Sequence, residues 1–314
     1  MSIIRQIYYF LRLGRPLFLF GGILLHGLGV LIALSIGEPL NLAAFIWGQV
    51  AITSFQLMTH YSNDYFDLAA DKANPTPTRW SGGSRILPDG LINPRIALIT
   101  AIVSGVIGLF AAFWLALVIQ TGPLTLPLLL IALILAWSYS SPPLQLNMHG
   151  LGELSGAFLI TGLTPLVGYY LHAGRLDLLP FLAVFSLCCF QFAMLLAINF
   201  PDADGDAAAG KHTLLYFLGE TKTVRLYLVV LLAAYLALPV LVLLGLPPIA
   251  ALALFALSPL AAWQAWRMAH GAWADLDRWD SLGFWSVGLL IASVIAELLA
   301  FSWIFFRGDS GMTG

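Results

Sequence analysis

Long hydrophobic runs, separated by short polar breaks, repeat along almost the whole chain. A helix that crosses about 30 Å of hydrocarbon needs about 20 apolar residues, because each residue advances about 1.5 Å. By this criterion the pattern predicts about nine transmembrane helices, of which the fourth is the shortest. They cover residues 17–36, 42–60, 96–119, 124–139, 154–171, 178–198, 224–244, 248–266 and 282–306. We therefore expect an all-α membrane protein in which residues 1–314 form a single polytopic domain.

The basic residues predict an orientation, because cytoplasmic loops of membrane proteins carry an excess of Lys and Arg. With nine spans and a cytoplasmic N-terminus, twelve of the 14 basic residues fall on the cytoplasmic side. Only Arg175 and Arg307 fall on the other side. We therefore expect a multi-pass protein of the cell (inner) membrane with its C-terminus outside. The N-terminal segment, which mixes aromatic residues with three arginines, is expected to lie along the membrane surface.

Composition narrows the possible functions. Hydrophobic residues make up 60% of the chain and charged residues 10%, against about 25% charged residues in an average soluble domain. The net charge of −2 lacks the basic excess that a nucleic-acid-binding protein needs. The two cysteines, Cys188 and Cys189, are adjacent in an apolar run and lack metal-ligand spacing. The sequence therefore favours a lipid bilayer as partner and excludes nucleic acid and zinc or redox chemistry.

A first acidic cluster follows the second apolar run. Asn63, Asp64, Asp67 and Asp71 are spaced so that, on a helix, their side chains share one sector about 100° wide. One helical face at the edge of the membrane would then carry three carboxylates.

A second acidic cluster follows the sixth run. Asn199, Asp202 and Asp206 lie within about 60° of one another if the helix continues past Pro201, while Asp204 points away. Both clusters fall on the predicted cytoplasmic side.

Carboxylates this dense repel one another unless a cation lies among them, and hard oxygen ligands suit Mg²⁺. Magnesium usually takes one or two carboxylates together with water and phosphate oxygens. Two facing acidic helices therefore predict a clamp for a diphosphate bridged by Mg²⁺. The alternative is that the acids are hydrated, capped helix ends.

Basic residues follow each acidic cluster. Lys72, Arg79 and Arg85 follow the first cluster, and Lys211 follows the second. They are candidates to neutralise a departing diphosphate, and Arg85 and Lys211 are preferred because glycines lie beside them. The alternative is that they belong to the ordinary basic excess of cytoplasmic loops.

The two motifs and the order of about nine spans resemble the UbiA family of intramembrane aromatic prenyltransferases over nearly the whole chain. Residues 150–153 (Gly-Leu-Gly-Glu) and 210–214 (Gly-Lys-His-Thr-Leu) are similar to the MenA type, which prenylates 1,4-dihydroxy-2-naphthoate in menaquinone biosynthesis. Residues 82–90 differ from the Arg-Pro-Leu-Pro-Ser-Gly segment of ubiquinone-pathway members. Residues 139–144 resemble the corresponding segment of the chlorophyll synthase and homogentisate types. The acceptor therefore stays open among dihydroxynaphthoate, homogentisate, 4-hydroxybenzoate and chlorophyllide.

The resemblance implies a polyprenyl diphosphate held through Mg²⁺, with its tail among apolar helices and an aromatic acceptor beside it. The metal-binding residues it implies are Asn63, Asp67, Asp71, Asp202 and Asp206. Lys211 or Arg85 would stabilise the leaving diphosphate, and Asp64 would accept a proton. Lys72, Arg79 and Asn199 would complete the substrate site.

Other positions have two open interpretations. Tyr139 either stabilises an allylic cation by its ring face or simply packs. Arg15 either meets an acceptor carboxylate or anchors the chain at the interface. Glu153 either holds the acceptor or caps a helix N-terminus. His60 and His212 are expected to be loop residues without a role.

A divalent cation transporter is the alternative from another class. It predicts ionisable groups along a path near the middle of the bilayer. Only Glu297 lies deep in a predicted span, and we assign it no role.

Overall fold

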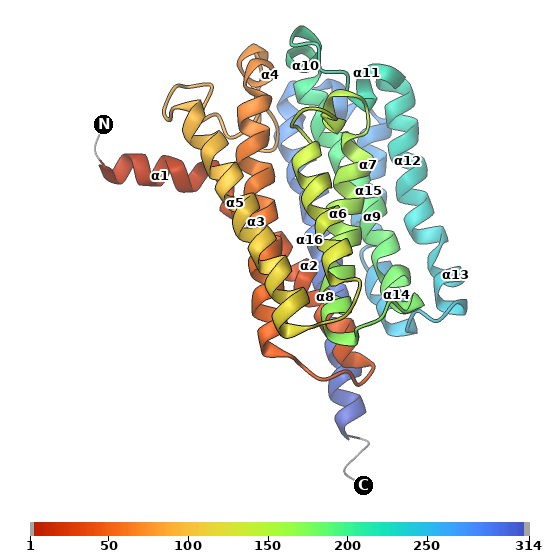
Figure 1. Ribbon diagram of the computed structural model, residues 1–314. Helices are drawn as coiled ribbons and strands as arrows, with labels where there is room; N and C mark the ends of the chain where they lie inside the picture. The colour runs from red at the N-terminus through yellow and green to blue at the C-terminus, as the bar shows by residue number, and fades with distance from the viewer. Residues whose placement is uncertain (1–2, 311–314) are drawn as a thin grey trace.

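Helices account for every predicted apolar run in the computed structural model, which describes residues 3–310 (Figure 1). No β-strand occurs within these residues. In this part of the chain, seven helical segments are long and apolar enough to cross a membrane, which confirms the all-α expectation. They are α2 (Pro16–Ser35), α3 (Leu42–Phe66), α5 (Pro94–Trp114) with η1 (Leu115–Ile119), α7 (Gly152–Ala157) with η3 (Phe158–Leu163) and α8 (Thr164–Ala173), α9 (Leu178–Asn199) with η4 (Phe200–Asp202) and α10 (Ala203–Ala208), α12 (Glu220–Leu236) with α13 (Leu238–Leu243), and α16 (Leu276–Ser310).

The two remaining runs do not form single long helices. Helices α14 (Pro248–Phe255) and α15 (Ser258–Ala269) are bent by 43° against each other and together form a broken eighth candidate span. Helix α6 (Thr125–Ser138) has 14 residues. At about 1.5 Å per residue it covers roughly 21 Å of the about 30 Å of hydrocarbon. The count of nine spans therefore stays a prediction.

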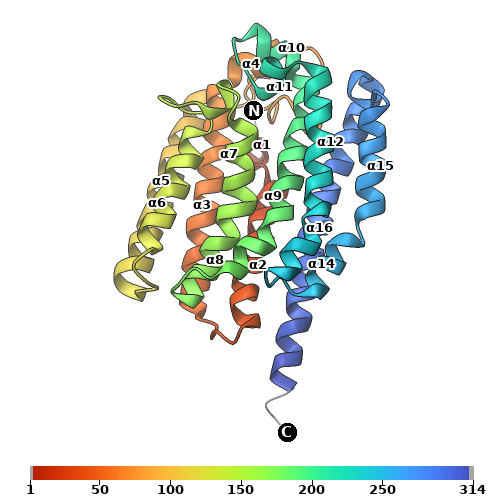
Figure 2. The same cartoon turned by 90° about the vertical axis from the view of Figure 1, so that its right-hand side faces the viewer.

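The helices run side by side in one bundle with two distinct ends (Figures 1 and 2). The short helices α4 (Leu68–Ala73), α10 and α11 (Leu214–Leu218) lie together at the upper end. The loop between α2 and α3 lies at the lower end, where Arg175 Nη1 and Glu38 Oε1, 2.7 Å apart, tie it to the loop after α8. Both acidic clusters therefore lie at one end of the bundle.

Helix α1 (Ile3–Leu13) lies across the other helices and projects from the bundle (Figure 1). Its apolar side chains are largely exposed: Ile3 exposes 74% of its surface and Ile4 exposes 80%. An amphipathic helix of this kind buries its apolar face in the lipid interface. The geometry agrees with the surface location expected for the N-terminal segment.

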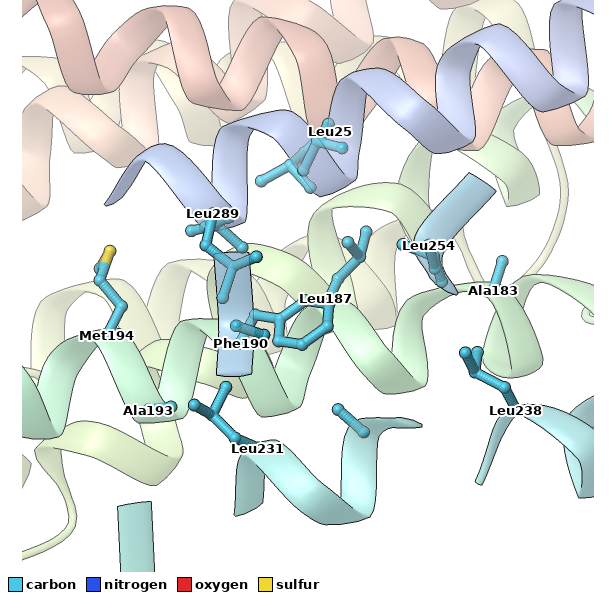
Figure 3. Close-up of a cluster of buried hydrophobic side chains, with 14 of the residues drawn as sticks. Leu25, Ala183, Leu187, Phe190, Ala193, Met194, Leu231, Leu238, Leu254 and Leu289 are labelled. Atoms are coloured by element: carbon cyan, nitrogen blue, oxygen red, sulfur yellow. The ribbon is translucent and has the colours of Figure 1, made fainter. Parts of the chain in front are cut away.

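Two hydrophobic cores hold the bundle together. The larger core draws Leu25 from α2, Leu187 and Phe190 from α9, Leu231 from α12 and Leu289 from α16 (Figure 3). The second core joins α3, α5 and α6. Many outward-facing Leu, Ile, Val and Phe side chains are exposed instead, as expected where lipid is the solvent.

Helices α2 and α8 approach each other closely at Gly29. A Cβ atom there would lie 1.9 Å from the carbonyl oxygen of Pro165, whereas a Cβ on Gly27, in the same helix, would meet nothing within 4 Å. Gly29→Ala should therefore lower the free energy of unfolding by about 1–3 kcal/mol through overpacking. Thermal unfolding of the purified protein in detergent measures this effect. Gly27→Ala is the matched control, and an equal change in both variants would contradict the account.

Candidate active site

The first acidic cluster spans a break between two helices. Helix α3 ends at Phe66, where the backbone N–H of Asp67 still donates to the carbonyl of Asn63 at 2.8 Å. Helix α4 then begins at Leu68 and carries Asp71. His60 lies within α3, so the expectation of a loop residue is wrong there, because the helix continues well past the apolar run.

The second acidic cluster also crosses a break. Pro201 has no N–H to donate, and α9 gives way at Asn199 to the 3₁₀ turn η4 before α10 begins. The helix therefore does not continue regularly through the motif. Helix α10 packs on the chain after α4, where Asn74 Nδ2 donates to Asp202 Oδ1 at 2.7 Å. Gly205 allows this approach, because a Cβ there would lie 2.7 Å from Asn74 Cα.

Lys211 joins the two clusters. Its Nζ lies 3.0 Å from Asp67 Oδ2 and 3.2 Å from Asp206 Oδ1, and 14% of its side chain is exposed. Burial lowers the pKa of Lys211, but the carboxylates of Asp67 and Asp206 outweigh burial and raise it overall. The structure thus brings the two predicted acidic groups face to face across one ammonium group.

Asp67 is the centre of the hydrogen-bond network. Asn63 Nδ2 donates to its Oδ2 at 2.9 Å, and Asn147 Nδ2 lies 3.1 and 3.0 Å from its two oxygens. Ser140 Oγ accepts hydrogen bonds from both amides. Neither Asn147 nor Ser140 was predicted from the sequence as a site residue. Their only signal was that polar residues follow an apolar run on the same predicted side.

Asp64 has partners other than Lys211. It forms an ion pair with Arg15 and accepts hydrogen bonds from the hydroxyl and backbone N–H of Ser84. Arg15 also donates to Asn63 at 3.3 Å, so two side chains of the first acidic cluster hold it. Asp64 thus holds Arg15 at the edge of the acidic site.

Asp71 is buried beside the loop after α4. Burial, followed by repulsion from Asp64 and Asp67, raises the pKa of Asp71 to about 8. Its Oδ2 atom is buried without a hydrogen-bond partner. Gly83 lies against this atom, because a Cβ on Gly83 would be 2.0 Å from it.

A cavity of about 220 Å³ extends from the acidic end into the bundle. Its polar wall includes Arg15, His60, Asn63, Asp67, Asp71, Asn199, Asp202 and Lys211. Deeper positions are mainly apolar and include Ala132, Ala136, Leu159, Ile160, Met194, Leu195 and Ile198. Tyr139 lines the cavity as well. The arrangement suits a ligand with a highly charged head and a long apolar tail.

Several predicted site residues do not line this cavity. Lys72 is exposed, and the backbone of Arg79 donates to Asp280 at 3.0 Å. Arg85 donates to the backbone carbonyl of Asp71. Glu153 is buried in the first turn of α7 and accepts from Asn199 Nδ2 at 2.8 Å, so it orients Asn199.

Comparison with known proteins gives the family. The model of the UbiA prenyltransferase family matches residues 23–288. Two proteins named 1,4-dihydroxy-2-naphthoate octaprenyltransferase are similar in sequence. The one from Mycobacterium leprae is 27% identical over 185 residues, which is 59% of this chain and 60% of that protein. The one from Mycobacterium tuberculosis is 30% identical over 169 residues, 54% of this chain and 56% of that protein. The alignments thus span less than two thirds of these relatives.

A third relative has a different name. A digeranylgeranylglyceryl phosphate synthase from Natronomonas pharaonis is 29% identical over 225 residues, 70% of this chain and 72% of that protein.

Among solved structures, a UbiA homolog from Archaeoglobus fulgidus bound to GPP and Mg²⁺ has a TM-score of 0.61. It is 15% identical, and the match covers 92% of this chain and 99% of that one. Because the family model spans most of the sequence, this multi-pass membrane protein belongs to the UbiA prenyltransferase family.

Proposed function

We propose that this protein transfers a polyprenyl group from its diphosphate to a hydroxylated aromatic acceptor in a Mg²⁺-dependent reaction, and that the acceptor is 1,4-dihydroxy-2-naphthoate. One observation carries the proposal: two acidic segments meet across Lys211 at the head of a cavity whose deeper walls are apolar. The names of the two mycobacterial relatives support the choice of acceptor. We take residues 1–314 as one prenyltransferase domain.

The residues of the site are suited to Mg²⁺. Within residues 3–310, no three carboxylate, histidine or cysteine side chains form a complete metal site. Magnesium usually takes only one or two carboxylates and completes its shell with water and phosphate oxygens. Asp71 Oδ2 and Asn147 Oδ1 are buried oxygens without partners, as an oxygen-ligand site for a hard cation requires. The residues that would hold Mg²⁺ are Asn63, Asp67, Asp71, Asp202 and Asp206.

When bound, Mg²⁺ neutralises the charge that develops on the leaving diphosphate. The residues of the chain supply the rest. Asn63 and Asn147 orient Asp67 by hydrogen bonds, and Glu153 orients Asn199. Lys211, displaced from the carboxylates, donates to the diphosphate. The apolar walls exclude water, which would otherwise capture an allylic cation as an alcohol, and Tyr139 offers such a cation its ring.

The basic residues outside the cavity keep more distant roles in this proposal. Arg85 supports Asp71 through its backbone carbonyl, and Asp64 keeps Arg15 at the rim. Arg15 lines the cavity, and in this proposal it meets the carboxylate of the acceptor. Lys72 and Arg79 add positive charge at the entrance for an incoming diphosphate.

We also propose that the acidic end faces the cytoplasm of a cell (inner) membrane. The loops that join α3 to α5, α9 to α12 and α15 to α16 lie at the same end of the bundle (Figures 1 and 2). These loops and their flanking helix ends hold nine of the basic residues. Arg175 instead pairs with Glu38 in the loop between α2 and α3, and Arg307 lies in the last turn of α16, whose C-terminal end is at the opposite end of the bundle. The excess of positive charge on cytoplasmic loops supports this orientation.

Replacement of Gly83 tests the position of Asp71. Gly83 and Gly90 share a φ of +70°, but only at Gly83 would a new Cβ strike a carboxylate. Both Gly83→Ala and Gly90→Ala carry the same backbone strain of about 1–2 kcal/mol. Gly83→Ala should lower kcat/KM roughly 100-fold by displacing Asp71, whereas Gly90→Ala should stay near wild type. Similar activity in the two variants would contradict the role of Asp71.

An acceptor panel tests the proposed function. The purified protein, with Mg²⁺ and a long-chain allylic diphosphate, is offered dihydroxynaphthoate, 4-hydroxybenzoate, homogentisate, chlorophyllide and a geranylgeranylglyceryl phosphate. Mass spectrometry identifies the products. We expect diphosphate release and prenylated dihydroxynaphthoate. The fifth acceptor is included because the alignment with the Natronomonas pharaonis relative is the longest of the three. Reaction with the geranylgeranylglyceryl phosphate alone would contradict the proposal of an aromatic acceptor. Divalent cation flux in proteoliposomes, with no prenyl transfer to any acceptor, would favour a transporter.

A further inference from the structure

His60 is a partly buried histidine that the proposed reaction leaves without a role. It lies on α3, one helical turn before Asn63, and its ring meets Phe18 of α2 edge to face. Its Nδ1 lies 2.9 Å from the carbonyl oxygen of Gly14. A carbonyl can only accept a hydrogen bond, so in the neutral ring Nδ1 carries the hydrogen and Nε2 keeps a lone pair.

The position of His60 gives that lone pair access to a ligand. His60 lines the cavity, and within residues 3–310 its Nε2 has no hydrogen-bond partner. Gln56 and Thr59 line the cavity on the same helix, so α3 presents a polar wall opposite the apolar side chains of α6 and α9. A flat aromatic ring with hydroxyl groups needs one such wall for its polar edge.

We propose that Nε2 of His60 accepts the hydroxyl proton of the acceptor and so makes the acceptor nucleophilic. This inference rests on the proposed function and adds both a catalytic residue and a location for the acceptor, against the Gln56–His60 face of α3. Any acceptor with a hydroxyl group beside its reacting atom can use this contact.

The step balances as follows for an aromatic acceptor. The ring carbon forms a bond to the allylic carbon, while the carbon–oxygen bond of the prenyl diphosphate breaks and its electron pair leaves with the diphosphate. The hydroxyl proton passes to Nε2, and the ring oxygen becomes a carbonyl. The group replaced on the ring carbon then leaves, as a proton to the diphosphate or, from a carboxylate, as CO₂. The remaining electron pair restores the ring, and His60 returns its proton to the oxygen.

Other bases near the cavity are already engaged. Asp64 is paired with Arg15 and does not line the cavity, and Asp67 accepts hydrogen bonds from two amides and Lys211. Arg15 and Asp64 are the charged groups that act on His60, and Phe18 of α2 meets its ring edge to face. Asp71 and Asp202 also line the cavity, but in the proposed function both hold Mg²⁺. Among the described residues that line the cavity, Nε2 of His60 is therefore a base that the proposed metal site leaves open toward an acceptor.

His172 supplies a matched control. Its Nδ1 lies 3.0 Å from the carbonyl of Gly168, the same type of contact, but His172 does not line the cavity. His60→Gln keeps an amide donor for Gly14 and removes the base. We expect kcat to fall 100-fold or more, with the KM for the acceptor within threefold and Mg²⁺-dependent binding of the prenyl diphosphate unchanged. His172→Gln should keep wild-type kcat.

The pH profile and chemical rescue separate a base from a structural contact. A base must be unprotonated to act, so the acid limb of the wild-type kcat should be steeper by one proton than that of His60→Gln. The contribution of carboxylates such as Asp71 to the acid limb should be the same in both proteins. Added imidazole should restore at least tenfold activity to His60→Gly. A kcat of His60→Gln within threefold of wild type, an unchanged acid limb, or no rescue would overturn the proposal. Absence of transfer by the wild-type protein would instead refute the proposed function.

Discussion

Asp67→Asn should lower kcat for prenyl transfer by at least about 1,000-fold, equivalent to about 4 kcal/mol of transition-state stabilisation. Asp67 accepts from Asn63, Asn147 and Lys211 at the point where the two acidic segments meet. An amide keeps the volume of the side chain but removes the charge that both a cation and Lys211 require. Steady-state kinetics with mass-spectrometric detection measures the loss. Thermal unfolding of the variant checks that folded protein is being compared.

Asp204 provides the control for this result. It is an exposed carboxylate in α10, two residues from Asp206, and it does not line the cavity. Asp204→Asn should retain wild-type kcat. If both variants kept full activity, Asp67 would have no part in the chemistry. If both lost it equally, net negative charge rather than the position of Asp67 would explain the effect.

Lys211→Met should lower kcat about 100-fold while leaving the apparent affinity for Mg²⁺ equal to or tighter than that of wild type. The two effects have opposite signs because Lys211 has two partners in this account. It supplies positive charge to the leaving diphosphate, and before substrate binds it occupies Asp67 and Asp206 in competition with a cation. Activity measured as a function of Mg²⁺ concentration separates them.

Lys72 is the matched cation for this test. It lies on α4 beside Asp71, but its side chain is exposed and does not line the cavity. Lys72→Met should change kcat less than threefold, as a screened surface charge does. Unchanged kcat in Lys211→Met would remove Lys211 from the reaction, and a weaker affinity for Mg²⁺ would show that it supports the cation rather than competing with it.

Hydropathy predicted the helical segments well, because each apolar run had to be helical to satisfy its backbone in lipid. It did not predict where helices bend. Residues 248–266 form one apolar run, yet α14 ends at Phe255 and α15 starts at Ser258. Pro259 cannot donate to the carbonyl of Phe255, which accounts for the break. The number of residues that a helix needs to cross the hydrocarbon core also depends on how far the helix is tilted or bent. The number of spans therefore cannot be derived from composition alone.

Spacing on a helix predicted which acids belong together, and the structure places Asp67, Asp206 and Lys211 in direct contact. It did not predict that Asp64 turns to Arg15, because that contact joins α3 to a turn 49 residues earlier in the sequence. Asn147 was missed for the same reason, since it lies 80 residues from Asp67. Periodicity describes the faces of one helix, whereas these pairings are set by tertiary packing.

Equilibrium binding of an unreactive prenyl diphosphate analogue is the most direct test of the central claim, that the facing acidic segments hold the diphosphate through Mg²⁺. Isothermal titration calorimetry of the purified wild-type protein measures it with Mg²⁺ and with a chelator. We predict one analogue bound per chain, with an affinity at least 100-fold higher when Mg²⁺ is present. Equal affinity in the two conditions would contradict the claim, because Lys211 and the neighbouring amides would then bind the diphosphate without a cation.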